Sequence, residues 1–166
     1  MLPFEARPTG HTAFEPDVLT FEIDPHEITQ IDKIARENNT PVAVCLQACW
    51  QTLVWRLTGQ TEFVVFADCD GRKHEELQEA LGLFAKWLPM RCHFETSTEF
   101  NEILKRADEA TRRAYEWQEY FAWEQSIGAA AFLGAIGFEF VEQPRKRLAA
   151  GVWFSVYAQR SCSERF

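Results

Sequence analysis

The sequence lacks several patterns on which common classes of function depend. Its 166 residues hold 17 Lys and Arg against 25 Asp and Glu, a net charge of −8. This balance argues against a general nucleic-acid surface, because phosphate binding needs clustered basic side chains. No apolar run approaches the length of a membrane-spanning helix, and the first residues lack the basic-then-apolar order of a signal peptide. We therefore expect a cytoplasmic protein that contacts neither nucleic acid nor membrane.

Metal and nucleophile chemistry also lack their usual residue patterns. The five cysteines include no C-x-x-C pair, and no two of the four histidines are adjacent. Cys45 and Cys49 are four residues apart on an apolar helical pattern, so we expect both to point into the core as small hydrophobic side chains. Asp68-Cys69-Asp70 follows an apolar strand, as in metal-dependent glycosyltransferases, but no nucleotide-binding pattern accompanies it. We expect no metal site and no catalytic residue in this chain.

What is present is an alternation of helical and strand patterns over one domain. Residues 1–16 hold three prolines and predict an extended lead-in. The patterns then predict a strand at Leu19–Ile23, a helix begun by Asp24-Pro25, a helix between Thr40 and Gly59, and a strand at Phe63–Ala67. Next come a short helix at Glu75–Leu81, a strand at Leu88–Phe94 and a long helix over Phe100–Ala114. An Ala- and Gly-rich mobile connection at 126–137 is followed by strands at Ile136–Val141 and Val152–Ala158, with a charged turn at Gln143–Arg147 between them. This order fits an α/β fold, a mixed β-sheet with helices packed on it.

The helix between Thr40 and Gly59 has a wide apolar face, which predicts deep packing. We assign to that face Val42, Cys45, Leu46, Cys49, Trp50, Leu53, Val54 and Leu57.

Two segments carry the most specific signal. Leu81–Arg91 reads LGLFAKWLPMR, and Trp117–Glu124 reads WQEYFAWE. In this order, and after the turn Asp70-Gly71-Arg72, they resemble two landmark motifs of the condensation domains of non-ribosomal peptide synthetases, roughly (I/V)GxFVNT(L/Q)xxR and HQDxPFE. LPFEARP at the start resembles the linker between the two lobes of those domains, and TPVAVCLQACWQTLVWRLTGQTEFVVF resembles their long helix and following strand. The match is good over Leu2–Glu124 and looser over Gly151–Phe166.

The resemblance implies the C-terminal lobe of a chloramphenicol acetyltransferase-like fold. Residues 1–16 would be the inter-lobe linker, and 17–166 the lobe, truncated at its C-terminal end. In such domains two lobes enclose a tunnel in which an acceptor amine attacks a donor acyl thioester and forms an amide. Carrier proteins deliver both substrates on phosphopantetheine, so the implied partners are the N-terminal lobe and carrier proteins, with no cofactor bound directly. The catalytic signature HHxxxDG of the N-terminal lobe is absent from this sequence, so we expect the chain alone to be inactive.

The resemblance also nominates site residues. Asp70, Gly71 and Arg72 would form a turn near the active site. The tunnel candidates are Lys86, Trp87, Arg91, Trp117, Gln118, Tyr120 and Trp123. Lys86-Trp87 replaces the family's Asn-Thr, and the family's His, Asp, Pro and Phe become Trp117, Glu119, Ala122 and Trp123. These departures either reshape the tunnel or mark a lineage whose chemistry has drifted.

Several alternatives stay open. Trp117, Tyr120, Phe121 and Trp123 could form core, and Arg91 could form a structural ion pair. The whole chain could be a non-catalytic module that docks carrier proteins or recruits a partner enzyme. Ser163–Phe166 resembles the start of another strand, so we expect self-association through an unpaired sheet edge or a disordered C-terminal stretch. The residues specify neither the substrates nor the amide-forming, epimerising, cyclising or ester-forming branch.

Overall fold

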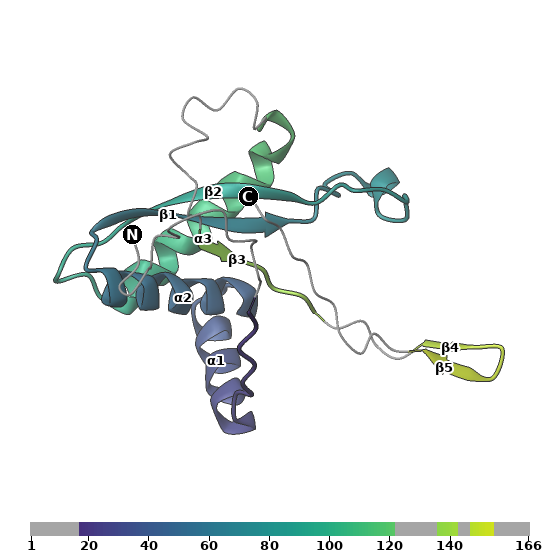
Figure 1. The fold of residues 1–166 in the computed structure, drawn as a ribbon, viewed down its shortest axis with the longest axis horizontal. Coiled ribbons are helices and arrows are strands. Elements are labelled where there is room, and N and C mark those ends of the chain that lie inside the picture. The colour runs from purple at the N-terminus through teal and green to yellow at the C-terminus, as the bar shows by residue number, and fades with distance from the viewer. Residues whose placement is uncertain (1–16, 122–135, 143–146, 155–166) are drawn as a thin grey trace, which may run out of the picture.

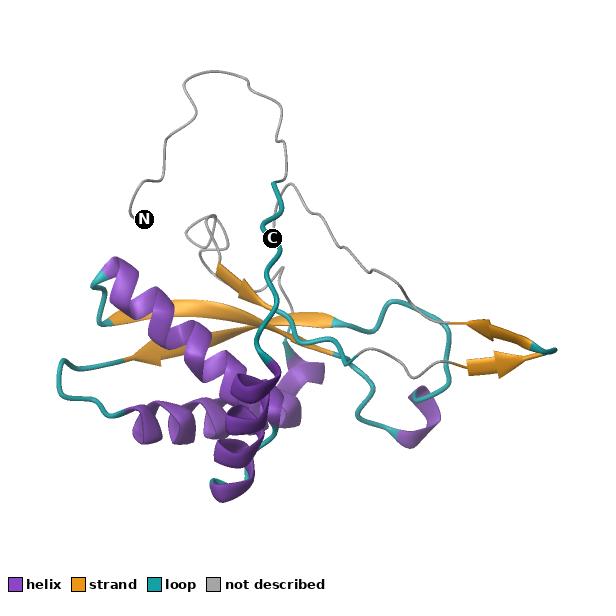
Figure 2. Cartoon of the chain, turned by 90° about the horizontal axis from the view of Figure 1, so that it is seen from below, coloured by secondary structure: helices purple, strands orange, loops and turns teal. Residues whose placement is uncertain are grey.

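The computed structural model describes residues 17–121, 136–142 and 147–154 (Figure 1). Its elements are α1 (Pro25–Glu37), α2 (Val42–Thr58), β1 (Glu62–Cys69), the 3₁₀ helix η1 (Glu75–Leu77), β2 (Lys86–His93), α3 (Phe100–Trp117), the 3₁₀ helix η2 (Gln118–Tyr120), β3 (Ile136–Phe138), β4 (Arg147–Ala149) and β5 (Val152–Phe154). The strands β2, β1 and β3 form one sheet in that order, antiparallel between β1 and β2 and parallel between β1 and β3. The predicted mixed sheet with packed helices is therefore confirmed. The hairpin β4–β5 extends away from that sheet in both views (Figures 1 and 2).

The helix boundaries follow from capping residues. The side chain of Asp24 accepts a hydrogen bond of 2.7 Å from the His26 N–H, and Pro25 occupies the first turn, where its missing N–H is harmless. At the other boundary, Gly59 ends α2 in the left-handed conformation with φ +66°. Its N–H reaches the Trp55 carbonyl at 2.8 Å, which satisfies a terminal acceptor of the helix.

The antiparallel ribbon of β1 and β2 is in continuous register from Glu62 opposite His93 to Cys69 opposite Lys86. Because side chains alternate along a strand, Leu88, Met90 and Cys92 share one face of β2 and are buried. Pro89 is exposed on the opposite face, and β2 is an edge strand of the sheet. An edge position tolerates proline because its missing N–H removes no ladder bond when it points outward.

The core lies between the sheet and the three long helices. All three contribute, as does the sheet, and the buried members are Ala35, Val44, Cys45, Ala48, Trp55, Val65, Cys92, Phe94, Ile103, Leu104 and Ala107. Phe94 is 1% exposed, and its ring centroid lies 5.5 Å from that of Trp55 and 5.6 Å from that of Phe63. Burying one such aromatic side chain contributes about 2–3 kcal/mol to stability. In Figure 2 the helices cross the sheet, with α2 and α3 running beside each other.

Two expectations about elements were wrong, and one strand was not predicted. Leu19–Ile23 forms no strand, and its Leu19 and Phe21 are 89% and 76% exposed, because no strand among the described residues supplies a hydrogen-bond ladder beside it. The helix predicted at Glu75–Leu81 is only the 3₁₀ turn η1. The strand β4 was missed, because its short segment lies beside a charged turn pattern. The predicted strands at Phe63–Ala67 and Leu88–Phe94 are confirmed as β1 and β2, and β3 and β5 coincide with the late strands.

The buried face of α2 also differs from the predicted one. Cys45 and Val54 are buried, but Leu53 and Leu57 are 47% and 56% exposed, and Cys49 is exposed. The side that packs instead includes Val44, Gln47, Ala48, Gln51 and Trp55. The helix is apolar on almost every side, so its periodicity does not select one face. The expectation that both cysteines point into the core is therefore wrong for Cys49.

Candidate functional site

The turn Asp70-Gly71-Arg72 follows β1 and begins the loop that leads to β2. Gly71 has φ +68°, and a Cβ atom added there would lie 1.8 Å from the backbone oxygen of Phe84. Glycine is therefore required both for its backbone conformation and for the close approach of the chain at Gly71 to the backbone of Phe84. The Asp70 carboxylate accepts a hydrogen bond of 3.0 Å from the Arg72 N–H and closes the turn.

The side chain of Arg72 organises the remainder of this loop. Its guanidinium donates to the carbonyls of Leu77 and Ala80, the second at 2.7 Å, and lies 4.6 Å from the centroid of the Phe84 ring. The Gln78 side-chain amide donates to the Arg72 carbonyl at 2.7 Å. A planar guanidinium can bind two carbonyls and stack on a ring at the same time. Arg72 therefore connects Leu77, Ala80 and Phe84 within this loop.

The two motif segments meet through Lys86 and Gln118. Lys86 Nζ donates to the backbone carbonyl of Gln118 at 3.0 Å, across 32 residues of sequence. Gln118 is 1% exposed, and its Nε2 donates to the Tyr115 carbonyl at 2.9 Å. Its Oε1 has no hydrogen-bond partner within the described part of the chain. Lys86, one of the residues that depart from the family motifs, thus joins the two segments.

Two further side chains, Lys73 and His74, reach the same end of α3. Lys73 Nζ donates to the Glu116 carbonyl at 3.0 Å. His74 Nε2 lies 2.7 Å from Glu119 Oε1, an ion pair when the imidazole is protonated. Sequence reasoning did not identify Lys73 or His74 as part of this site, because nothing local in the chain indicates contacts across more than 40 residues.

Trp117 and Tyr120 lie on the surface next to these contacts. They are 63% and 76% exposed, and their ring centroids are 5.5 Å apart. The alternative that these two side chains form core is therefore wrong, whereas Phe121 is half-buried. Trp123 lies outside the described residues. The structure thus brings together Lys86, Gln118 and an exposed aromatic pair.

Trp87 follows Lys86 on β2, so its side chain is on the opposite face of the sheet, and it is paired with Asp68 of β1. The Trp87 ring is half-buried and covers β3: a Cβ atom on Gly137 would lie 3.1 Å from its Cζ3. Burial raises the pKa of Asp68, and the nearby carboxylates of Glu139 and Asp70 raise it further.

Arg91 forms the structural ion pair that one interpretation of the sequence allowed. Its Nη2 lies 3.0 Å from Glu62 Oε2, and His93 Nδ1 lies 3.3 Å from the other oxygen. The hydrogen bond and charge of Arg91 hold the pKa of Glu62 below its ordinary value. Both side chains are exposed, so this pair adds little to stability.

No metal-binding set occurs in the described residues, where no group of three His, Cys, Asp or Glu side chains could hold an ion. Burial raises the pKa of Cys69 to about 11 and that of Cys92 to about 12, so both remain protonated thiols and poor nucleophiles at neutral pH. Helices in this part of the chain are too short or too polar to cross a membrane.

A family model settles the affiliation. The model of the condensation domain matches residues 1–122. The chain belongs to the condensation-domain family. It is 34% identical to bacitracin synthase 3 of Bacillus licheniformis over 119 residues, which are 72% of this chain and 2% of that protein. It is 30% identical to bacitracin synthase 1 of the same organism over 72% of this chain and 2% of that protein. The sequence relatives are thus non-ribosomal peptide synthetases.

Solved condensation domains share the fold. The first condensation domain of the CDA synthetase matches 79% of this chain with a TM-score of 0.63 and 18% identity, and the match covers 30% of that chain. The condensation domain of the monacolin K polyketide synthase matches 70% with a TM-score of 0.59 and 21% identity, covering 26% of that chain. The chain therefore has a chloramphenicol acetyltransferase-like fold and spans less than a third of those domains.

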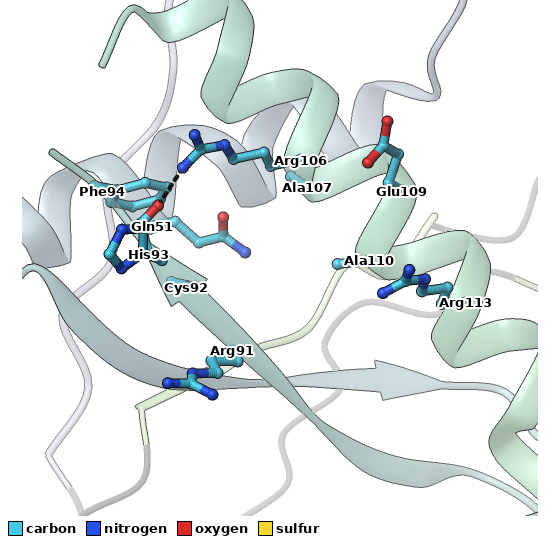
Figure 3. A pocket seen from close by; sticks show the side chains of 10 residues that line it. All are labelled: Gln51, Arg91, Cys92, His93, Phe94, Arg106, Ala107, Glu109, Ala110 and Arg113. Carbon is cyan, nitrogen blue, oxygen red and sulfur yellow. Dashed lines mark hydrogen bonds between the residues drawn. The ribbon is translucent and has the colours of Figure 1, made fainter. Parts of the chain in front are cut away.

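This condensation-domain chain also has a cavity that sequence reasoning missed (Figure 3). Its volume is about 320 Å³, and it lies between β2 and α3. The residues that line it are Gln51, Arg91, Cys92, His93, Phe94, Arg106, Ala107, Glu109, Ala110 and Arg113. Arg106 Nη1 donates to the His93 carbonyl at 2.6 Å, and its Nη2 pairs with Glu102. Because Glu62 and Glu102 neutralise two of the three arginines, the cavity carries little excess charge.

A second, apolar groove lies along the exposed side of α2. Its volume is about 300 Å³, and it is lined by Leu46, Cys49, Trp50, Leu53, Phe138, Glu139 and Phe140. Of the two exposed leucines of α2, Leu53 lines this groove and Leu57 does not.

Proposed function

We propose that this chain forms the C-terminal lobe of a condensation domain of a non-ribosomal peptide synthetase and supplies part of the tunnel wall. The observation that carries the proposal is the hydrogen bond between Lys86 and Gln118, which joins two family motifs in one place. Next to that bond, Trp117 and Tyr120 present exposed rings. Aromatic faces of this kind can contact an acyl chain or a pantetheine arm without requiring a charge.

The reaction in the complete domain would be amide formation. The acceptor amine nitrogen attacks the carbonyl carbon of the donor thioester, the C–S bond breaks, and the carrier thiol leaves with the proton lost by the amine. A positioned base is needed for that proton. In the described part of the chain His26 lies on α1, His74 in the loop after β1 and His93 on β2, all exposed and none adjacent to another. The base would therefore come from the other lobe.

The partners in this proposal are an N-terminal lobe with the HHxxxDG signature and two carrier proteins. The carrier proteins bring both substrates on phosphopantetheine, so this lobe would bind the arms only while they are in the tunnel. Trp87, with its ring over Gly137, is the remaining candidate for contact with substrate. Arg91 is a weaker candidate, because Glu62 already occupies its guanidinium.

The proposal is tested in a protein that contains both lobes. Single-turnover amide formation between a donor-loaded and an acceptor-loaded carrier is compared for the wild type, Trp117→Ala and Tyr120→Ala. We expect a loss of about tenfold or more in rate for each variant, because misplaced substrates react slowly. Phe21→Ala is the matched control, since Phe21 is also an exposed aromatic but lies outside the proposed wall. Full activity of both variants, or a parent reading frame without an HHxxxDG lobe, contradicts the proposal.

A second candidate is a non-catalytic module that docks carrier proteins. The exposed Trp117–Tyr120 pair favours it, because such a pair serves binding equally well without a base. Titration with a loaded carrier protein, followed by amide chemical shifts, discriminates between the two. Binding without turnover by the two-lobe protein favours the docking module, and turnover favours the condensation reaction.

A further inference from the structure

The C-terminal end of α3 lacks the features that normally terminate a helix. The last four carbonyls of a helix have no partner inside it, and its C-terminus carries partial negative charge. The last turn of α3 contains no basic residue and does contain an acid, Glu116. Gln118 follows in the right-handed helical region, so no left-handed glycine caps the end. Within the local chain, the Gln118 side chain donates to the Tyr115 carbonyl and the 3₁₀ turn η2 continues the helix, and the carbonyls of Glu116 and Gln118 accept from elsewhere.

Lys73 and Lys86 supply the missing donors from another part of the chain. Their ammonium groups donate to the carbonyls of Glu116 and Gln118, each at 3.0 Å. A cation at this position satisfies a free carbonyl and also interacts favourably with the helix dipole. His74 adds the contact with Glu119 at 2.7 Å. We call the two ammonium groups of Lys73 and Lys86 the cationic clamp, and the His74–Glu119 contact lies beside it.

The clamp residues are connected to hydrogen-bonded structure on both sides. Lys73 and His74 directly follow Arg72, whose guanidinium fixes the loop through Leu77 and Ala80. Lys86 is the first residue of β2 and is paired with Cys69 in the ribbon. The clamp therefore fixes the end of α3 relative to β2 and to the loop that follows β1.

Gln118 shows why such a clamp is needed. Its side chain is almost fully buried, yet its Oε1 has no partner among the described residues. An unsatisfied buried oxygen opposes this conformation, so other contacts must hold the residue in place. Trp117 precedes Gln118, and Tyr120 lies two residues after it, so the same contacts determine where both rings lie.

We infer that the cationic clamp positions the Trp117–Tyr120 pair, and that Lys86 is a positioning residue rather than a substrate contact. The consequence for catalysis rests on the proposed function, but the clamp itself does not. In this inference the Lys86 that replaces the family's Asn acts on substrate only through the aromatic pair. Its ammonium is already bound to a backbone carbonyl.

Hydrogen exchange of the backbone amides at the end of α3 and in η2 tests the clamp in the full chain. Lys86→Met and Lys73→Met keep the aliphatic stem and remove the ammonium. We expect exchange of the amides of residues 115–120 to become about tenfold faster in each variant, since hydrogen bonds to charged groups are the stronger ones. Lys86→Arg, which retains charge and donors, is expected to restore slow exchange.

Lys105→Met is the matched control, because Lys105 is an exposed lysine of the same helix and forms no ion pair within the described residues. Exchange in Lys86→Met and Lys73→Met equal to that in the control overturns the clamp. Using two separate variants keeps the test valid if one of them fails to fold, which far-UV circular dichroism reveals.

Turnover in the two-lobe protein separates the clamp from the proposed function. A positioning role predicts that Lys86→Met slows amide formation and that Lys86→Arg recovers most of it. Faster exchange with unchanged turnover supports the clamp and contradicts the tunnel-wall role of the aromatic pair. Reduced turnover with unchanged exchange overturns the clamp, because Lys86 would then act directly.

Discussion

The two ends of the β1–β2 ribbon are stabilised by different forces. At the end where Glu62 faces His93, the rings of Phe63 and Phe94 pack with Trp55 against the helices. At the end where Cys69 faces Lys86, the chain leaves the sheet as a loop that depends on a glycine turn, one guanidinium and the cationic clamp. The first end, which we call the packed end, is stabilised by buried apolar area. The second, which we call the loop end, is stabilised by a few individual hydrogen bonds.

This difference sets how each end responds to substitution. Apolar packing tolerates exchange among similar side chains as long as volume is kept, so single substitutions at this end need not alter any connection. The loop end depends on single hydrogen bonds. The side chain at position 86 therefore decides whether the Gln118 carbonyl has a partner there. The proposed site lies at the second end.

The largest expected effect is at the packed end. Phe94→Ala should lower the free energy of unfolding by about 3–5 kcal/mol, because it removes a buried ring and leaves a cavity beside Trp55. Chemical denaturation measures this loss. Phe21→Ala, at a 76% exposed position, should change stability by less than about 0.5 kcal/mol. Equal losses in the two variants would show that the packed end is not the stabilising one.

A pair of glycine variants compares the two ends directly. Gly59 and Gly71 have nearly the same φ, +66° and +68°, but only Gly71 has an atom within 4 Å of the added Cβ, the Phe84 oxygen at 1.8 Å. Gly59→Ala should cost about 1–2 kcal/mol from the left-handed conformation alone. Gly71→Ala should cost more than that and expose residues 72–84 to limited proteolysis. Similar costs and similar cleavage patterns in both variants would contradict the close approach to Phe84.

Asp68 gives a pH-dependent test at the loop end. Its pKa is raised by burial, so the folded state holds the proton more tightly than the unfolded state does. Stability should therefore fall as pH rises from about 3.9, the ordinary value for aspartate, through the folded pKa. Asp68→Asn should melt at a higher temperature than the wild type at pH 7, and the difference should vanish in acid. A lower melting temperature at pH 7 would mean that the Asp68 carboxylate makes a favourable contact.

Glu62, at the packed end, should show the opposite dependence of stability on pH, and the smallest effect of these variants. Arg91 lowers its pKa, so the stability that it contributes is present above about 4.3, the ordinary value for glutamate, and is lost as pH falls through the folded pKa. Glu62→Gln should lower the melting temperature slightly at pH 7, with no difference in strong acid. High salt should reduce the effect, because the pair is exposed. An effect as large as that of Phe94→Ala would contradict the comparison.

The packed end was largely predictable from sequence. The runs of alternating and continuous apolar residues fixed β1 and β2, and Asp24, Pro25 and Gly59 marked helix boundaries by known local chemistry. The exposed side of α2 was not predictable, because a helix that is apolar all round does not indicate which side its neighbours occupy.

The loop end was predictable only in part. The glycine turn could be recognised because Gly71 acts within its own few residues. The contacts of Lys73, His74 and Lys86 with the end of α3 could not, since they depend on the tertiary arrangement of segments that are far apart in sequence.

Pro89 disfavours the addition of another strand at the outer edge of β2. An incoming strand that approached the outer edge of β2 would find no N–H at Pro89, and the His93 carbonyl is already occupied by Arg106. Two rungs of any new ladder would be missing, so β2 is a poor template for intermolecular strand addition. If copies of this chain associate through their sheets, the contact should form away from β2.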